Sequence, residues 1–231
     1  MRQQGKGPDG SRPIAAVIFD LDGVLVDSEP LGYQIVNHLL TEYGVAMDWD
    51  DYRSIIGTTI SPWEILTAKH ALLLDREVFS NRFWSELERR VAAGELTALP
   101  GVRDALAHVH ERGLPLGLAS SSRRSYVAGV LRSLGVMHLF AAIVCREDVV
   151  TGKPDPAPFL EAARRLGVEP AVCLAIEDSP AGLAAARAAG MRALAVRTVY
   201  TREDDLREAH FILPSLEGLD LSRLTTHHQS P

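Results

Sequence analysis

Residues Ala15-Ala16-Val17-Ile18-Phe19-Asp20-Leu21-Asp22-Gly23 join a short apolar run to two carboxylates. The run is short, contains β-branched residues and is bounded by glycine, which predicts a buried strand of a parallel sheet. Open α/β sheets bind ligands at the carboxyl ends of their strands, where Asp20 and Asp22 fall. Two carboxylates there are unfavourable unless a divalent cation, or a reaction that uses both, compensates them. Asp and Gly also favour turns, so a simple turn is the alternative for this stretch alone.

The overall composition is that of an ordinary globular protein. The 231 residues are 46% hydrophobic and 23% charged, which suits one domain or a core with an inserted subdomain. The formal net charge of −6 gives no reason to expect nucleic acid or a membrane as partner. Cys145 and Cys173 each lie within an apolar run, which predicts buried thiols in a reducing compartment. We therefore expect the cytoplasm as the compartment, and we take a monomer as the default oligomeric state.

The chain divides into segments of different character. Residues 1–12 are polar and predict a disordered leader without a secretory signal, and residues 221–231 predict a flexible tail. Residues 29–97 show helical spacing without a convincing strand, which predicts a helical cap of about four helices. Asp48 and Ser80 are the expected N-caps within it. The α/β core then comprises residues 13–28 and 98–220, and the two crossings contain turn residues that suit hinges.

After the helical segment, predicted helices and strands alternate. Helices are expected over residues 102–112, 126–134, 157–166 and 181–189, each followed by glycine. Strands are expected over residues 114–119, 141–145, 172–176 and 192–196, with a weak last strand over residues 211–213. This alternation predicts an α/β fold, a Rossmann-like parallel-sheet core with a helical cap domain inserted after the first strand.

Polar residues follow the first four predicted strands at the same edge of the sheet. They are Asp20 and Asp22, Ser120 to Ser122, Thr151-Gly152-Lys153-Pro154, and Glu177-Asp178-Ser179. Each set alone has a structural explanation, because serine and aspartate cap helices and a loop lysine is usually solvated. Four sets in equivalent positions instead predict one site.

These residue types suit phosphoryl transfer. Carboxylates among other oxygen ligands suit Mg²⁺, hydroxyls and backbone amides at a helix start suit a phosphate, and lysine supplies a point charge for phosphate oxygens. One carboxylate can attack phosphorus to form an aspartyl-phosphate. A second can protonate the leaving oxygen and later activate water.

The motifs and their order resemble those of the haloacid-dehalogenase-like hydrolase superfamily. The similarity extends from about Ile14 to Leu219, and the helical insert is similar to the cap of the β-phosphoglucomutase-like branch. Four segments carry it: Asp20-Leu21-Asp22-Gly23-Val24-Leu25-Val26-Asp27-Ser28, Ala119-Ser120-Ser121-Ser122, Gly152-Lys153-Pro154-Asp155-Pro156 and Glu177-Asp178-Ser179-Pro180-Ala181-Gly182.

The resemblance implies roles for the acidic residues. Asp20 would be the nucleophile and a Mg²⁺ ligand, and Asp22 would be the general acid/base with its backbone carbonyl on the metal. Asp178 would bind Mg²⁺, and Glu177 would bind it or support the site. Asp22 argues against a dehalogenase or a phosphonatase, which resemble this family but lack that second carboxylate.

The resemblance also implies a phosphate site. Ser120 and the Ser121 N–H would hold the transferring phosphoryl group, and Lys153 would bridge that group to Asp20. A cis peptide bond is expected after Lys153. Gly57 and Thr58, in the cap loop, would face the leaving group.

The reaction implied is hydrolysis of a small phosphorylated metabolite, a sugar or polyol phosphate, by a Mg²⁺-dependent phosphatase. The first alternative is a hexose-phosphate mutase of the β-phosphoglucomutase type. Sugar mutases carry a cap-helix histidine and a cap-loop arginine, and the matching positions here are Gly32 and Ile60. The second alternative is a non-catalytic metabolite-binding protein, which the complete set of motif residues disfavours.

Overall fold

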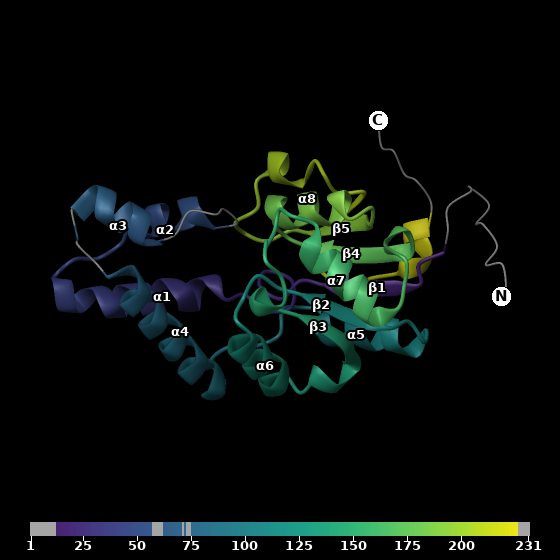
Figure 1. Ribbon diagram of the computed structural model, residues 1–231, viewed down its shortest axis with the longest axis horizontal. Helices are drawn as coiled ribbons and strands as arrows, with labels where there is room; N and C mark the ends of the chain where they lie inside the picture. The colour runs from purple at the N-terminus through teal and green to yellow at the C-terminus, as the bar shows by residue number, and fades with distance from the viewer. Residues whose placement is uncertain (1–12, 57–61, 71, 73–74, 226–231) are drawn as a thin grey trace.

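A parallel sheet lies at the centre of the molecule (Figure 1). The structure is a computed structural model that describes residues 13–56, 62–70, 72 and 75–225. The sheet has the order β3-β2-β1-β4-β5-β6, and each neighbouring pair is parallel. Its strands are β1 (Ala16–Phe19), β2 (Leu116–Ala119), β3 (Phe140–Val144), β4 (Cys173–Glu177), β5 (Arg192–Val196) and β6 (Phe211–Leu213). The predicted α/β class and the parallel sheet are confirmed.

Strand β1 is covered on both faces, which explains its unbroken apolar run. Successive side chains of a strand point to opposite faces. Ile18 therefore shares a buried cluster with Phe159 of helix α7 (Ala157–Leu166) and Leu183 of helix α8 (Pro180–Ala188). Phe19 belongs to the buried cluster on the other face, with Leu106 of helix α5 (Val102–Glu111). The fourth core helix is α6 (Arg124–Ser133).

Four described helices separate β1 from α5, and they lie to one side of the sheet (Figure 1). They are α1 (Glu29–Leu40), α2 (Trp49–Ile55), α3 (Pro62–His70) and α4 (Arg76–Ala92). Helix α4 also packs on α6 of the core. The helical insertion after the first strand is therefore confirmed. Short 3₁₀ helices are η1 (Thr41–Tyr43), η2 (Met137–Leu139), η3 (Arg146–Asp148), η4 (Pro170–Val172), η5 (Glu203–Leu206) and η6 (Leu221–Thr225).

The two chain segments that connect the insert to the core run side by side. Val26 and Ala98 form an antiparallel bridge, and the Leu99 N–H donates to the Leu25 carbonyl at 2.9 Å. The exit and the return of the chain are therefore joined by backbone hydrogen bonds at one point. The proposed hinges and the boundaries at residues 29 and 97 stay predictions.

One of the two N-caps predicted for the insert differs in the structure. The prediction that Ser80 caps α4 is wrong, because Asp75 accepts hydrogen bonds from the backbone N–H groups of Glu77 and Val78, both at 3.0 Å. Asp48 does cap α2, accepting from the Asp51 N–H at 2.8 Å. Asp75 follows a segment whose apolar residues gave no clear helix start, so spacing alone did not locate the cap.

Residues near the C-terminus and both cysteines are buried in the core. Residues 221–225, which the sequence placed in the tail, form η6 and bury Leu221 and Leu224. Cys145 and Cys173 are buried free thiols, as expected. The leader, residues 1–12, lies outside the described residues, as do Gly57, Thr58 and Ile60. No helix in the described part of the chain combines the length and the hydropathy needed to cross a bilayer.

A glycine at the return to the core allows a close backbone approach, which a matched pair of substitutions tests. Gly101 has φ +77°, and a Cβ there would lie 2.3 Å from the Glu217 backbone nitrogen. Gly113 has φ +66° with nothing within 4 Å of the same position. Alanine at either site incurs a left-handed backbone cost of about 1–2 kcal/mol. We expect Gly101→Ala to lower the free energy of unfolding by about 1–3 kcal/mol more than Gly113→Ala does. Urea unfolding measures both, and equal losses would contradict the close approach.

Candidate active site

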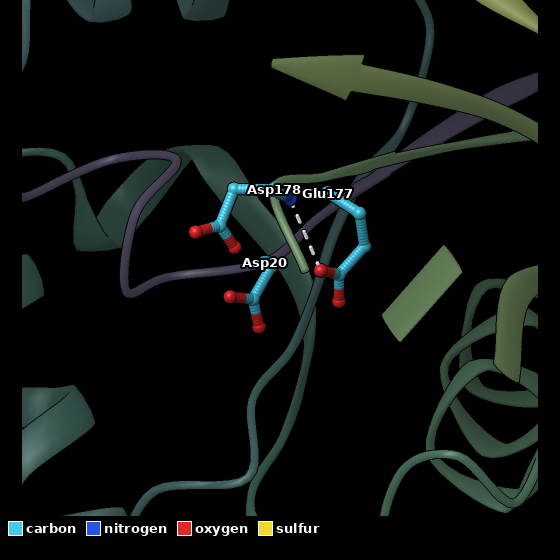
Figure 2. A group of neighbouring side chains, drawn as sticks. All are labelled: Asp20, Glu177 and Asp178. Atoms are coloured by element: carbon cyan, nitrogen blue, oxygen red, sulfur yellow. Dashed lines mark hydrogen bonds between the residues drawn. The ribbon is translucent and has the colours of Figure 1, made fainter. Parts of the chain in front are cut away.

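Three carboxylates meet at the carboxyl ends of β1 and β4 (Figure 2). Asp20 follows β1, Glu177 ends β4, and Asp178 comes next in the chain. The strand register places Phe19 opposite Ile176, and the Asp20 N–H donates to the Ile176 carbonyl at 2.9 Å. One oxygen from each carboxylate lies within 4.8 Å of the others. Residues more than 150 positions apart in the sequence thus form one acidic group, as the sheet-edge argument predicted.

Two glycines allow the carboxylates to approach the backbone so closely. A Cβ on Gly23 would lie 2.0 Å from an Asp178 carboxylate oxygen, and a Cβ on Gly182 would lie 1.9 Å from the Glu177 carboxyl carbon. Gly23 also has φ +78°, which favours glycine. Any larger residue at either position would displace a carboxylate. The glycines of the Asp-x-Asp-Gly and Ser-Pro-Ala-Gly segments are therefore part of the site.

Lys153 bridges two of the carboxylates. Its ammonium donates to Asp20 Oδ1 at 2.5 Å and to Glu177 Oε1, and its side chain is only 6% exposed. The Lys153–Pro154 peptide bond is cis, as the resemblance predicted. Glu177 Oε2 accepts from the backbone N–H groups of Asp178 and Ser179 and from the Ser179 hydroxyl, at 3.0 to 3.3 Å. Both oxygens of Glu177 are thus engaged within the protein.

The charge balance of this group is negative. Two buried carboxylates and one partly buried carboxylate lie around a single ammonium, so burial and mutual repulsion favour protonation. Burial raises the pKa of Asp20 to about 7. The ammonium of Lys153 opposes this rise, whereas the negative charges of Glu177 and Asp22 add to it. Burial, with Glu177 and Asp20 close by, also raises the pKa of Asp178 well above its ordinary value. Oxygen donors with uncompensated negative charge fit a hard divalent cation such as Mg²⁺.

Asp22 is held by three hydroxyl groups. Its Oδ1 accepts from Ser28 and from Tyr126, both at 2.7 Å, and its Oδ2 accepts from Ser122 at 2.8 Å. Burial and the charge of Asp22 raise the pKa of Tyr126 far above its ordinary value, so the phenol stays a hydrogen-bond donor. These three partners of Asp22 are not predicted from the sequence. Ser28 and Ser122 lie in quoted motifs, but Tyr126 gave only the signal of a core residue on a helix.

The predicted phosphate-binding residues line the same cavity as Asp20 and Asp22. This cavity has a volume of about 690 Å³, which is large enough for a small metabolite. The cavity is also lined by Ser120, Ser121, Lys153 and Asp178. Glu177 is buried and is not among the lining residues. Ser120 is buried, and its hydroxyl accepts from the Ser122 N–H at 3.1 Å. The structure therefore brings together every predicted site residue that it describes.

Glu29 is a cavity residue that the sequence analysis missed. It begins α1 and lines the cavity from the insert. Burial, the charge of Asp22 and, more weakly, that of Asp27 raise its pKa to about 7, although a hydrogen bond from Tyr52 opposes the shift. A Cβ on Gly32 would lie 2.4 Å from the Tyr52 hydroxyl. Gly32 therefore provides the space in which Tyr52 reaches Glu29.

Comparison with known proteins places this arrangement among hydrolases. A family model described as haloacid dehalogenase-like hydrolase matches residues 17–196. Hexitol phosphatase B of Escherichia coli (strain K12) is 33% identical over 233 residues, covering 93% of this chain and 96% of the relative. The crystal structure of CbbY from Rhodobacter sphaeroides in complex with phosphate has a TM-score of 0.79 at 27% identity, covering 89% and 96% of the two chains. β-Phosphoglucomutase from Clostridium difficile has a TM-score of 0.75 at 27% identity, covering 91% and 95%.

The crowding of carboxylates makes a prediction about stability without metal. An acid whose folded-state pKa lies above its unfolded value keeps its proton longer when folded, so stability falls as pH rises between the two values. Asn cannot ionise. We therefore expect Asp178→Asn to raise the free energy of unfolding in EDTA relative to the unsubstituted chain. This gain should be larger at pH 8 than at pH 5 by about 1 kcal/mol or more.

Thermal and urea unfolding at the two pH values measure this difference. Asp104→Asn, at an exposed position on α5, is the matched control and should show no such pH-dependent gain. Added Mg²⁺ should stabilise the unsubstituted chain and stabilise Asp178→Asn much less. A loss of stability in Asp178→Asn at pH 8 without metal would contradict the proposed crowding.

Proposed function

The chain belongs to the haloacid dehalogenase-like hydrolase family, and we propose on that premise that it is a Mg²⁺-dependent phosphatase of a small sugar or polyol phosphate. The observation that carries the proposal is the placement of Asp20 at the end of β1. Its carboxylate contacts Lys153 and shares a cavity with Asp22 and Ser120. The name of hexitol phosphatase B, a relative at 33% identity, supports this substrate class.

Asp20 would act as the nucleophile. A carboxylate oxygen of Asp20 forms a bond to phosphorus while the bond from phosphorus to the ester oxygen breaks. The Ser120 hydroxyl, the Ser121 N–H and the Lys153 ammonium would hold the phosphoryl oxygens. Glu177 would support Lys153, since both of its oxygens are already engaged.

Asp22 would act as general acid and then as general base. It protonates the leaving ester oxygen in the first step, and then takes a proton from the water that attacks the aspartyl-phosphate. Ser28, Ser122 and Tyr126 would hold it for these transfers. Asp20, Asp178 and the backbone carbonyl of Asp22 would hold Mg²⁺, which when bound offsets the charge of the carboxylates and of the phosphate.

The insert would act as a cap over this site. Glu29 and Ile56 reach the cavity from residues 29–97, whereas Asp20, Lys153 and Asp178 belong to the core of residues 13–28 and 98–220. A cap of this kind excludes water while the aspartyl-phosphate forms. The loop residues Gly57 and Thr58 stay candidates for leaving-group contacts.

One observation favours a phosphatase over a hexose-phosphate mutase. The position matching the mutase histidine is Gly32, and the Tyr52 hydroxyl occupies the space that a side chain there would need. A mutase must also retain a doubly phosphorylated intermediate, whereas a phosphatase passes its phosphoryl group to water. The similarity to β-phosphoglucomutase keeps the mutase as the second candidate.

Product analysis tests this proposal. Incubation with Mg²⁺ and a set of hexitol and hexose phosphates should release inorganic phosphate, and EDTA should abolish the release. A mutase would instead convert one hexose phosphate into its isomer, with dependence on a hexose bisphosphate and little free phosphate. Binding of these esters without phosphate release or isomer formation would support the non-catalytic alternative.

Substitution of the two β1 aspartates should have different effects. Asp20→Asn should eliminate turnover, because an amide is a poor nucleophile. Asp22→Asn should lower kcat by about 10²–10⁴-fold through loss of proton transfer. Mg²⁺ affinity should change little in Asp22→Asn, because the backbone carbonyl remains.

Steady-state kinetics and calorimetric Mg²⁺ titration measure these effects, with thermal unfolding to verify folding. An ester with a good leaving group needs less protonation, so Asp22→Asn should accumulate phosphoenzyme with it. Asp104→Asn serves as the unaffected control. Near-normal turnover of a hexitol phosphate by Asp22→Asn would rule out the acid/base role.

A further inference from the structure

The cavity is also lined by residues that phosphoryl transfer does not use. Beyond the reacting groups, it is lined by Ile56, Val149, Val150 and Pro158, with Glu29 on the insert side. Arg146 also lines it, and apart from Lys153 it is the sole lysine or arginine among the described lining residues. Lys153 is already held by two carboxylates. Arg146 is therefore the cation still available to a ligand.

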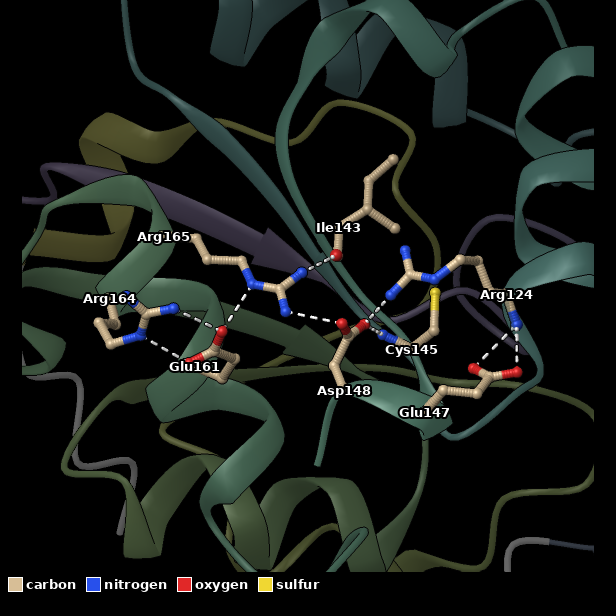
Figure 3. Close-up of polar contacts among 8 residues, drawn as sticks. All are labelled: Arg124, Ile143, Cys145, Glu147, Asp148, Glu161, Arg164 and Arg165. Atoms are coloured by element: carbon tan, nitrogen blue, oxygen red, sulfur yellow. Dashed lines mark hydrogen bonds and ion pairs between the residues drawn. The ribbon is translucent and has the colours of Figure 1, made fainter. Parts of the chain in front are cut away.

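The two residues that follow Arg146 in the chain, Glu147 and Asp148, belong to a group of paired charges (Figure 3). Both of these carboxylates are engaged by residues other than Arg146. Glu147 accepts the Arg124 backbone N–H with both oxygens at 3.1 Å, and Asp148 pairs with Arg124 and with Arg165. In the described part of the chain, no carboxylate lies within 4 Å of the Arg146 guanidinium, and its side chain is exposed. The surrounding network thus leaves this one charge uncompensated at the cavity.

The same network fixes the backbone that carries Arg146. Its N–H donates to the Ser122 carbonyl at 3.1 Å, so the start of η3 is tied to the loop that holds Asp22. The Cys145 N–H donates to an Asp148 oxygen at 2.7 Å, and the Asp148 N–H donates to the Cys145 carbonyl at 3.0 Å. A long side chain on an ordered turn has a fixed point of attachment beside the reacting groups.

We propose that Arg146 binds a second anionic group, a carboxylate or a second phosphate, on the leaving group of the substrate. This inference rests on the proposed phosphatase function and narrows its substrate class to sugar or polyol phosphates with a second anion. Arginine matches both groups, because its planar fork donates two parallel hydrogen bonds to a carboxylate or phosphate. The other titratable side chains that line the cavity, apart from Lys153, are the carboxyl groups of Asp20, Asp22, Glu29 and Asp178, and none of them offers a positive charge to such an anion. Arg146 would therefore set the direction in which the substrate enters.

Three matched esters test the proposal. The esters differ only at the C1 end of the chain. That end is a hydroxyl in D-glucitol 6-phosphate, a carboxylate in 6-phospho-D-gluconate and a second phosphate in D-glucitol 1,6-bisphosphate. We expect kcat/KM to be higher for at least one of the two anionic compounds than for D-glucitol 6-phosphate. The anionic compound with the higher kcat/KM shows whether the site prefers a carboxylate or a second phosphate.

Arg146→Gln should lower kcat/KM for the preferred anionic compound by about 10-fold, the loss expected for one charge-assisted contact. It should change kcat/KM for D-glucitol 6-phosphate by less than about 2-fold. Arg146→Lys keeps the positive charge but not the planar guanidinium. Its kcat/KM for the preferred anionic compound should lie between the values of the unsubstituted chain and of Arg146→Gln. Arg132→Gln on α6, at an exposed position outside the cavity lining, is the matched control and should change neither value.

Two results would overturn the assignment. One is an unchanged preference in Arg146→Gln, and the other is an equal loss for all three esters, which would indicate a general effect on the site. Calorimetric binding of the same esters to Asp20→Asn gives an answer that does not depend on turnover. If no ester is hydrolysed, the proposed function fails, whereas selective loss of binding in Asp20→Asn with Arg146→Gln would still support the anion site.

Discussion

Lys153 lies between Asp20 and Glu177, and the rest of the site depends on this buried contact. Two carboxylates from neighbouring strands would repel each other at the sheet edge without the ammonium between them. Ion pairs with Asp20 and Glu177 keep the pKa of Lys153 raised even though burial opposes its charge. Removing one member of a buried pair typically destabilises a protein by about 3–5 kcal/mol. The ammonium thus holds Asp20, the proposed nucleophile, in place and would supply positive charge to a phosphoryl group.

The sheet explains why one lysine suffices to organise the group. Strand β1 lies between β2 and β4, so the residues following these strands meet without long side chains having to reach across the fold. Gly23 and Gly182 then let Asp178 and Glu177 lie directly against the backbone. The arrangement leaves more negative than positive charge, which is unfavourable for the protein alone and suits a site that takes up a divalent cation.

The sequence predicted most of this because the information is local. An apolar run followed by Asp-x-Asp-Gly identifies the central strand and its edge, and the order of the four motifs identifies the family. Contacts between distant segments gave no such signal. Tyr126 reads only as an apolar helix position, yet it binds Asp22 across 104 residues of sequence. Arg146 and Glu29 read as ordinary surface charges, because only the packed fold shows that they line the cavity.

The partners of Asp22 link the insert to the reacting groups. Ser28 immediately precedes α1, while Tyr126 lies on α6, where its ring contacts Trp84 of α4 edge-on at 5.7 Å. The first helix of the insert thus follows a residue that binds Asp22, the carboxylate proposed to move the proton, and the last helix contacts another residue that binds it. A shift of the insert would change the surroundings of Asp22 together with access of water to the cavity. If Asp22 transfers the proton and the insert excludes water, as proposed, both functions would depend on the position of the same helices.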